Sequence, residues 1–296
     1  MHGSSNGFHA NSCLPQGEAA IRTAVANGVT PPNGVAGPDI LRVEDLTVTF
    51  SGFKALSNLN FSVRKGELRV VIGPNGAGKT TLLDVVTGKT RPRHGRVLYR
   101  GEDVTKKSAE RIARLGIGRK FQTPNVFKSL SVLENLRLAQ RSHRGVLASL
   151  AACFLGSDAA RIDDILDTIN LTAKAHRLAG LLAHGEKQWL ELGMLMAQDP
   201  ELLLVDEPVA GMTPRESEKT GELLMAMSRK HTLLVIEHDM TFVRQIAQKV
   251  TVLDEGKTLC EGTVDEVQND PKVIEVYLGN DKETHAADRE PVDVVR

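Results

Sequence analysis

The spacing of hydrophobic residues predicts strands at the start of the ordered chain. Beyond residue 40, apolar residues recur at about every second position in two stretches, and polar residues fill the gaps. The apolar positions are Leu41, Val43, Leu46, Val48 and Phe50, and then Leu59, Phe61 and Val63. A period of two predicts half-buried antiparallel strands. The run from Leu68 to Ile72 is almost continuously apolar, which predicts a fully buried strand.

Helices and strands alternate along most of the remaining chain. Predicted helices cover Lys79 to about Thr87, Ser108–Leu115, Glu186–Gln198, Arg215–Lys230 and Asp239–Gln248. Predicted strands cover Arg96–Tyr99, Ile117–Gln122, Leu202–Val205 and Thr232–Ile236, followed by a hairpin over Val250–Cys260 and a helical segment over Val264–Leu278 that Pro271 interrupts. The first helix ends at Gly88, as helices often end at glycine. This alternation predicts an α/β fold.

A purely helical stretch interrupts that alternation between about residues 129 and 183. Ser131 and Glu134 have the spacing of a capping box, which predicts that a helix begins there. A second helix is predicted from apolar residues spaced three and four apart, namely Ile162, Ile165, Leu166 and Ile169. We therefore expect an inserted α-helical subdomain.

Both ends of the chain are expected to be disordered. Residues 1–39 are rich in Asn, Gly, Ser and Pro, and residues 280–296 are charged and aperiodic. A single folded domain is therefore predicted over residues 40–279.

Composition excludes some classes of protein. The 296 residues include 37 basic and 37 acidic ones, so the formal net charge is zero and the basic footprint of a nucleic-acid-binding protein is missing. Cys13, Cys153 and Cys260 fit no metal-ligand spacing and are expected to be reduced thiols. The longest apolar run, Val146–Leu155, is too short to cross a bilayer, and no secretory signal precedes it.

The clearest chemical signal is a glycine-rich loop directly after the strand that ends at Ile72. It fills the phosphate-loop pattern G-x-x-x-x-G-K-[ST] with Gly73, Pro74, Asn75, Gly76, Ala77, Gly78, Lys79, Thr80 and Thr81. Glycines let successive backbone N–H groups point inward, and the helix that follows adds the positive end of its dipole. Lys79 is expected to reach the β- and γ-phosphates of a nucleotide, and Thr80 to bind Mg²⁺. Such a loop alone fits kinases, GTPases, helicases and transport ATPases.

Two further strand ends carry candidate catalytic residues. The apolar strand from Leu202 ends in Asp206 and Glu207, and ligands of parallel sheets bind at such ends. Asp206 is expected to hold Mg²⁺, and Glu207 to position or deprotonate the attacking water. His238 follows the strand Thr232–Ile236. By itself such a histidine is more often a structural residue than a catalytic one, and a contact with the γ-phosphate is implied only by family resemblance.

These motifs resemble the ATP-binding subunits of ABC transporters over about residues 41–278. The phosphate loop matches Walker A, Leu202–Glu207 matches Walker B, and His238 matches the switch histidine. Gln122 lies at the Q-loop position, Leu182–Glu186 at the signature position and Val209–Thr213 at the D-loop position. Phe50 aligns with the aromatic residue that stacks on adenine, although Phe53 is a close alternative. The resemblance implies a P-loop ATPase core with an N-terminal antiparallel β subdomain and an inserted helical subdomain.

The resemblance also implies how the protein works. Two ATPase subunits close head to tail over two ATP molecules, and each site takes the phosphate loop from one subunit and the signature from the other. Ala183, Gly185 and Glu186 would then bind the phosphate held by a second, non-identical ATPase subunit. Gln122 would sense Mg²⁺ and the attacking water. The implied partners are two permease subunits and a periplasmic solute-binding protein, which place this chain at the cytoplasmic face of the inner membrane.

Two positions depart from the family pattern. Ala183 replaces the signature serine, and Thr213 replaces the aspartate of the D-loop. The first change removes a hydroxyl that would donate a hydrogen bond to phosphate, an interaction that contributes about 1.5–3 kcal/mol. The second puts communication between the two ATP sites in doubt.

Shorter motifs resemble the importer branch for branched-chain amino acids and urea. Ala183–Glu191 and Pro208–Thr213 are most similar to the urea importer, so urea is the solute that the sequence favours, with branched-chain amino acids as the alternative. A soluble ABC ATPase that acts on DNA or ribosomes is a third hypothesis. The neutral charge and the single ATPase cassette count against it.

Overall fold

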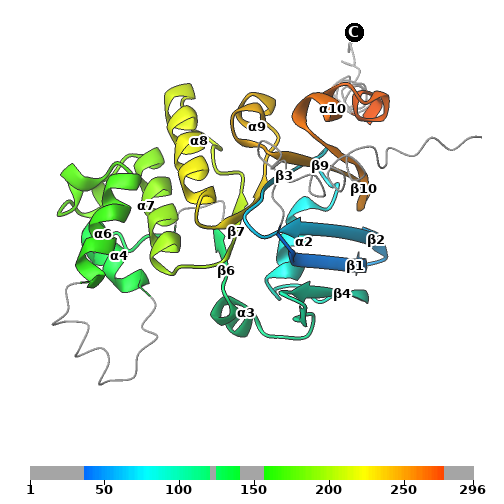
Figure 1. The fold of residues 1–296 in the computed structure, drawn as a ribbon, viewed down its shortest axis with the longest axis horizontal. Helices are drawn as coiled ribbons and strands as arrows, with labels where there is room; N and C mark the ends of the chain where they lie inside the picture. Colours follow the sequence, from blue (N-terminus) through cyan, green and yellow to red (C-terminus); the bar gives the residue numbers. More distant parts are fainter. Residues whose placement is uncertain (1–36, 121–124, 141–156, 277–296) are drawn as a thin grey trace, which may run out of the picture. The chain divides into compact units, whose positions relative to one another are not determined.

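The structure is a computed structural model that describes residues 37–120, 125–140 and 157–276 (Figure 1). All of them belong to one unit, Gly37–Arg296. The predicted tails therefore lie outside the described residues, except for residues 37–39. Strand β1 already begins at Asp39, because the Lys65 N–H donates to the Pro38 carbonyl and extends the pairing by a residue.

The alternating stretches near the start of the unit form an antiparallel sheet, as predicted. Its strands are β1 (Asp39–Phe50), β2 (Phe53–Arg64), β4 (His94–Tyr99) and β5 (Glu102–Asp103), in the order β2-β1-β4-β5. Ser51 and Gly52 join β1 to β2, and both have positive φ, which suits a tight hairpin turn.

A second sheet of six strands contains the predicted buried strands. They are β3 (Leu68–Ile72), β6 (Ile117–Lys120), β7 (Leu202–Asp206), β8 (Thr232–Ile236), β9 (Lys249–Asp254) and β10 (Lys257–Gly262). The order is β10-β9-β3-β8-β7-β6, and every pairing except that of β10 with β9 is parallel. The carboxyl ends of β3, β8, β7 and β6 are therefore neighbours along one edge.

The helices lie close to their predicted positions. They are α2 (Lys79–Val86), α3 (Ala109–Leu115), α4 (Val132–Ala139), α6 (Ser157–Thr168), α7 (His184–Ala197), α8 (Pro214–Ser228), α9 (Met240–Ile246) and α10 (Val264–Gln268). The short turns η1 (Thr172–Lys174) and η2 (Ala179–Leu181) precede α7. The break at Pro271 is confirmed, because α10 ends at Gln268 and helix resumes at Pro271.

Helices cover both faces of the parallel sheet, and alternate strand residues separate into two cores (Figure 1). Val71, Leu204 and Leu234 face a core that they share with α2 and the antiparallel sheet. Val70, Leu203, Val205, Leu233 and Val235 face the core that α7, α8 and α9 complete. Both faces are apolar because both are covered, which explains the continuous apolar runs of β7 and β8.

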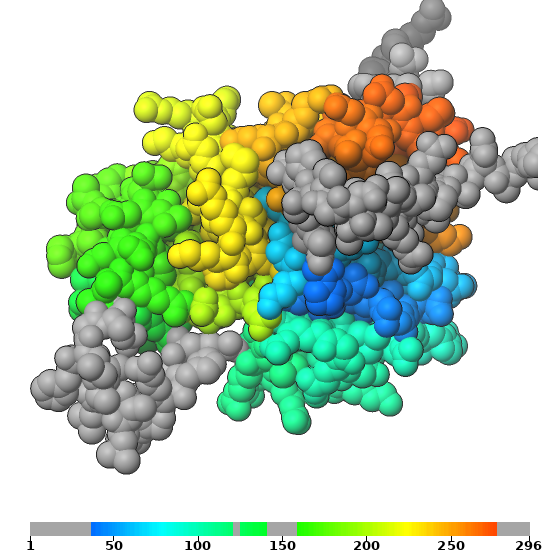
Figure 2. All heavy atoms as spheres, in the orientation of Figure 1, coloured from blue at the N-terminus to red at the C-terminus, as the bar shows by residue number. Residues whose placement is uncertain are grey.

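The described parts of the predicted helical subdomain are helical. Ser131 and Glu134 form the predicted capping box, in which the Glu134 N–H donates to Ser131 Oγ at 3.2 Å and the Ser131 N–H donates to Glu134 Oε2 at 2.7 Å. The predicted apolar stripe of α6 is buried against α4 and α7. In Figure 2 the side chains of this helical part, in green, gather beside those of α8, in yellow.

Other sequence predictions differ from the structure or lie outside it. Helix α7 begins at His184, two residues before the predicted start. Cys260 is buried, whereas Cys13 and Cys153 lie outside the described residues. Among the helices that the structure describes, none is long and apolar enough to cross a membrane.

Candidate nucleotide-binding site

The predicted phosphate loop joins β3 to α2, and its glycines are required by the neighbouring backbone. Gly73 has φ of 150°, and a Cβ atom there would lie 2.1 Å from the carbonyl oxygen of Leu253. Gly78 has φ of 96°, and its Cβ would lie 2.5 Å from the carbonyl oxygen of Ala55. No other residue fits such positions without moving a strand or turn. The loop is therefore held in shape by β2 and by the turn after β9.

Lys79 lies at the start of α2 and folds back over the loop. Its ammonium group donates to the carbonyl oxygens of Gly73 at 2.7 Å and Pro74 at 2.8 Å. Partial burial lowers the pKa of Lys79, and the nearby carboxylates of Glu207 and Asp206 oppose that shift. The positive charge thus lies between the loop and the two predicted catalytic carboxylates.

Asp206 is buried at the end of β7, and the surroundings of its two oxygens differ. Oδ2 accepts from the Arg119 guanidinium at 3.3 Å, whereas Oδ1 has no hydrogen-bond partner among the described residues. Burial raises the pKa of Asp206, although Arg119 opposes the shift. A buried carboxylate oxygen without a partner suits a divalent cation, and Mg²⁺ typically binds one or two protein oxygens together with phosphates and waters. The site therefore fits the predicted metal, and Thr80, its second predicted ligand, lies in the first turn of α2.

Glu207 has an unusual backbone conformation for its residue type. Its φ is 44°, in the left-handed region, and its N–H donates to the Ile236 carbonyl at 3.0 Å. Its Oε1 lies 3.8 Å from His238 Nδ1. Left-handed non-glycine residues that the surrounding structure imposes are frequent at active sites. The ends of β7 and β8 therefore bring together the two predicted catalytic side chains.

The sequence did not reveal the role of Glu237, which precedes His238. Its buried carboxylate accepts from the backbone N–H groups of His238 at 2.9 Å and Asp239 at 3.4 Å, and from that of Val209 at 3.4 Å. One carboxylate thus links the turn that carries His238 to the predicted D-loop. Burial raises the pKa of Glu237, while these N–H groups lower it.

Arg119 is a second residue whose role became clear only in the structure. It extends from β6, and its guanidinium donates to Asp84 Oδ1 at 2.5 Å as well as to Asp206. Asp84 belongs to α2, so Arg119 ties the helix after the phosphate loop to the metal-binding strand end. No spacing rule in the sequence links Arg119 to Asp84, which lies 35 positions earlier.

The predicted signature residues form the first turn of α7. Ala183 is the N-cap, and its N–H donates to Glu186 Oε2 at 3.1 Å. Glu186 also forms an ion pair with Lys174. The early start of α7 follows from this contact, since Glu186 is the third residue of the helix and caps it. Among the described residues, no hydrogen bond or ion pair joins Ala183, Gly185 or Glu186 to the phosphate loop of the same chain.

Thr213, the departure in the predicted D-loop, has a structural role of its own. It is the N-cap of α8, where its hydroxyl accepts from the Glu216 N–H at 3.4 Å and donates to Glu216 Oε2 at 2.8 Å. Glu216 in turn lies against the signature turn, because a Cβ atom on Gly185 would come within 2.6 Å of Glu216 Oε1. The D-loop and the signature therefore meet through the start of α8.

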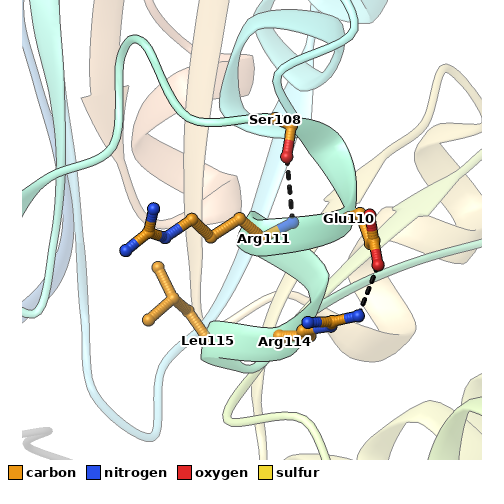
Figure 3. Close-up of a pocket in the computed structure, with 5 residues that line it drawn as sticks. All are labelled: Ser108, Glu110, Arg111, Arg114 and Leu115. Carbon is orange, nitrogen blue, oxygen red and sulfur yellow. Dashed lines mark hydrogen bonds and ion pairs between the residues drawn. The ribbon is translucent and has the colours of Figure 1, made fainter.

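The two candidates for the adenine platform are exposed aromatic residues at the β1–β2 hairpin. Phe50 and Phe53 are paired across the β1–β2 hairpin and are 48% and 65% exposed, so both remain candidates for the adenine platform. Gln122 lies outside the described residues. Figure 3 shows an open depression on α3, lined by Ser108, Glu110, Arg111, Arg114 and Leu115. None of the predicted site residues lines it.

Comparisons with known proteins agree with this geometry. A family model described as ABC transporter matches residues 56–210, and one described as branched-chain amino acid ATP-binding cassette transporter matches residues 257–283. The branched-chain amino acid transport ATP-binding proteins BraF of Pseudomonas aeruginosa and LivG of Escherichia coli are both 36% identical over 249 residues. The matches cover 81% of this chain and 98% of each relative. A probable LivG of Archaeoglobus fulgidus is 35% identical over 245 residues, which cover 81% of this chain and 95% of the relative.

Solved structures show the same fold. A nucleotide-free ATP-binding cassette from an ABC transporter has a TM-score of 0.70 and 32% identity, covering 81% of this chain and 99% of that one. The ADP conformation of such a cassette has a TM-score of 0.70 and 33% identity, covering 82% of this chain and 99% of that one.

Fold and site together define an ABC-type ATPase, an enzyme that binds and hydrolyses ATP. The chain belongs to the ABC transporter family, and within it to the ATP-binding subunits of the branched-chain amino acid type.

Proposed function

We propose that this chain is the ATPase subunit of an importer for branched-chain amino acids. The names of its relatives support this solute, whereas the sequence motifs alone had favoured urea. The observation that carries the ATPase role is the meeting of the phosphate loop, Asp206, Glu207 and His238 at the carboxyl ends of β3, β7 and β8. This edge of a parallel sheet is where ligands of such folds bind.

Each residue at this edge has a distinct task in the proposal. The N–H groups of loop 73–81 and the Lys79 ammonium bind the phosphates of ATP. Mg²⁺, held by Thr80 and Asp206 and sensed by Gln122, would neutralise charge on the phosphates when bound. Glu207 orients or deprotonates the attacking water, and His238 contacts the γ-phosphate.

The signature turn acts in the other half of a two-subunit site. Among the described residues, no hydrogen bond or ion pair joins its residues to the phosphate loop of their own chain, which supports the proposal that they serve a second, non-identical ATPase subunit. The backbone N–H groups at the start of α7 would bind the phosphate that this subunit holds.

We further propose that an exposed apolar surface on the helical part receives a permease. Phe127, Leu178 and Leu181 are exposed, and their two segments are joined because the Ala179 N–H donates to the Leu130 carbonyl at 2.9 Å. Exposed apolar patches of this kind mark interaction sites. Two permease subunits and a periplasmic solute-binding protein would complete the importer, with this chain at the cytoplasmic face of the membrane.

Urea remains a second candidate solute, favoured by the motifs around Trp189 and Met212. Uptake of labelled leucine and of labelled urea should be compared in a strain lacking this gene, complemented with wild type or with Glu207→Gln. We expect wild type alone to restore leucine uptake. If wild type restores only urea uptake, urea is the transported solute in place of branched-chain amino acids. If it restores the uptake of neither solute, the transport function is contradicted.

A further inference from the structure

Lys120 is a fully buried lysine at the carboxyl end of β6. Its side chain is 0% exposed, and its Nζ lies 3.8 Å from Glu191 Oε2. Glu191 belongs to α7, the helix that begins with the signature turn, and is itself buried. The ion pair therefore connects the parallel sheet to the signature helix inside the protein.

The other oxygen of Glu191 holds a second segment. Glu191 Oε1 accepts from the backbone N–H of Asn125 at 3.2 Å. Lys120 and Asn125 lie on either side of residues 121–124, so one carboxylate of α7 holds the chain both before and after them. A shift of α7 along its axis would break both contacts.

The charge of Lys120 also lies among the carboxylates of the active edge. Burial lowers the pKa of Lys120, and the carboxylates of Glu191, Asp206 and Glu237 oppose that shift. In the sheet register Lys120 is paired with Val205, the residue before Asp206. The ends of β6, β7 and β8 and the signature helix thus share one buried cation.

Stability alone explains this pair poorly. A buried ion pair loses so much hydration that apolar side chains of similar size often stabilise a protein as well or better. The core around α7 already supplies such residues, including Leu190 and Leu192. Apolar contacts have no preferred direction, whereas Glu191 has one defined partner at each oxygen, the Lys120 ammonium at Oε2 and the Asn125 N–H at Oε1.

We propose that Lys120 and Glu191 are a positioning pair that sets the signature turn in register with the catalytic edge of its own subunit. This inference rests on the proposed ATPase function and deepens it. In this proposal the pair acts through α7 and through the backbone at Asn125. It is expected to govern the rate of hydrolysis in the closed two-subunit site more than the binding of ATP to the phosphate loop.

The test uses single and paired substitutions in the full chain. Lys120→Met removes the cation beside the buried Glu191 carboxylate, and Glu191→Gln removes the carboxylate beside the buried Lys120 ammonium. Each single variant unbalances the buried charge and is expected to destabilise the subunit. The double variant Lys120→Met/Glu191→Gln removes both charges and is expected to melt close to wild type. Glu67→Gln is the matched control, because Glu67 forms a buried pair with Arg69 at 2.6 Å, at the opposite end of β3 from the phosphate loop.

Two measurements separate positioning from mere folding. In the assembled complex we expect the double variant to keep its KM for ATP within about twofold, while kcat falls about tenfold or more. Glu67→Gln should leave kcat unchanged after correction for folded protein. Lys120→Arg keeps the positive charge. We therefore expect its kcat to be much closer to that of wild type than the kcat of the double variant is.

The second measurement uses Trp189, the single tryptophan of the chain. It lies in α7 two residues before Glu191, and its Nε1–H donates to Thr220 Oγ1 of α8 at 2.9 Å. In a Glu207→Gln background, with the second ATPase subunit free of tryptophan, we expect MgATP to change the Trp189 emission. The change should disappear when the positioning pair is neutralised.

A well-folded double variant with wild-type kcat would overturn the inference, as would an equal loss of kcat in Glu67→Gln. So would an unaltered Trp189 response in the neutralised pair. If the wild-type subunit hydrolyses ATP but does not support uptake, only the proposed transport function is contradicted. The role of the positioning pair can still be tested, because the comparison of kcat values requires only ATP hydrolysis.

Discussion

Two helix N-termini in the described part of the chain, those of α2 and α7, suit an anion and are equipped very differently. The start of α2 has a loop shaped by Gly73 and Gly78, a lysine over it and two carboxylates nearby. The start of α7 has Ala183 as its N-cap, with no side-chain oxygen, and the Glu186 carboxylate folded back onto the cap. The first is a nearly complete phosphate site, while the second offers mainly backbone N–H groups and a dipole.

This difference indicates where each half of the chemistry lies. The α2 end can bind a nucleotide within one subunit, because all its groups come from the same chain. The α7 end adds few contacts, and in the proposed function it acts only on a phosphate that the second ATPase subunit holds. Changes at the α2 edge should therefore abolish activity, whereas changes at the α7 end should adjust it.

The largest effect is expected from Glu207→Gln. Removal of a general base typically slows a reaction by about 10²–10⁴-fold, while the loop that binds ATP is untouched. We expect hydrolysis to become barely measurable and the ATP-bound complex to accumulate, as followed by phosphate release and retained nucleotide. Glu255→Gln is the control, since Glu255 is an exposed glutamate with the same left-handed backbone, φ 45°. Turnover of Glu207→Gln at the control's rate would show that another residue activates the water.

The phosphate loop itself should respond to alanine according to the space around each glycine. Gly78→Ala places its Cβ against the Ala55 carbonyl. A Cβ on Gly76 would meet no neighbouring atom, so Gly76→Ala is strained only by its positive φ of 83°. We expect Gly78→Ala to weaken ATP binding at least tenfold and Gly76→Ala only a few-fold, since backbone strain costs about 1 kcal/mol. Calorimetric titration with MgATP measures both. Equal losses would mean that the close packing against β2 does not shape the loop.

An intermediate effect is expected from Glu237→Gln, which keeps one acceptor oxygen but removes the charge. Weaker hydrogen bonds from the N–H groups of His238 and Val209 should lower kcat about tenfold.

The same substitution should change how stability depends on pH. The pKa of Glu237 is raised by burial, so its contribution to stability is present below the ordinary carboxyl pKa and is lost as the pH rises through the raised value. Glu237→Gln should therefore gain stability relative to wild type as the pH rises, in melting curves at several pH values. A constant difference across pH would contradict this account of its burial.

The smallest effect is expected from Ala183→Ser. The backbone of Ala183, φ −63° and ψ 165°, closely matches that of the capping residues Ser131 and Thr213. A serine there should cap α7 and stabilise the subunit by about 1 kcal/mol even without nucleotide. We also expect ATPase activity of the complex to rise, because the hydroxyl can reach a facing phosphate.

Thr213→Ala is the mirror control for that substitution. It removes the hydroxyl from a complete capping box at α8 and should destabilise the subunit by a similar amount. Thermal unfolding of both variants compares the two caps directly. A rise in melting temperature without any rise in activity would show that the serine serves only the helix.

The sequence was most informative where one continuous segment carries both fold and chemistry. The phosphate loop, β7 and β8 were predictable because apolar runs end in glycine or in carboxylates, and the capping box of Ser131 and Glu134 marked the start of α4. The groups that join these segments were not predictable. Arg119 reaches Asp84 across 35 positions, and Glu237 reaches Val209 across 28. Only the strand order brings them together, so local patterns carry no trace of such contacts.

Thr213 shows the same limit from the opposite side. In the sequence, Thr213 could be described only as a replacement for the aspartate of the family's D-loop. In the structure it is the N-cap of α8. The sequence likewise placed the start of α7 too late, because Ala183 lacks the hydroxyl that usually marks an N-cap. The cap there comes from Glu186 alone.

The most direct test of the two half-sites is ATP-dependent association. Sedimentation should compare Glu207→Gln with Ala183→Asp/Glu207→Gln, each mixed with the second ATPase subunit and MgATP. Aspartate is a good N-cap, so α7 should stay intact, but its charge would repel a facing phosphate. We predict that Glu207→Gln associates and that the double variant stays apart while binding ATP with unchanged affinity. Equal association of both would contradict the claim that α7 completes a site on another subunit.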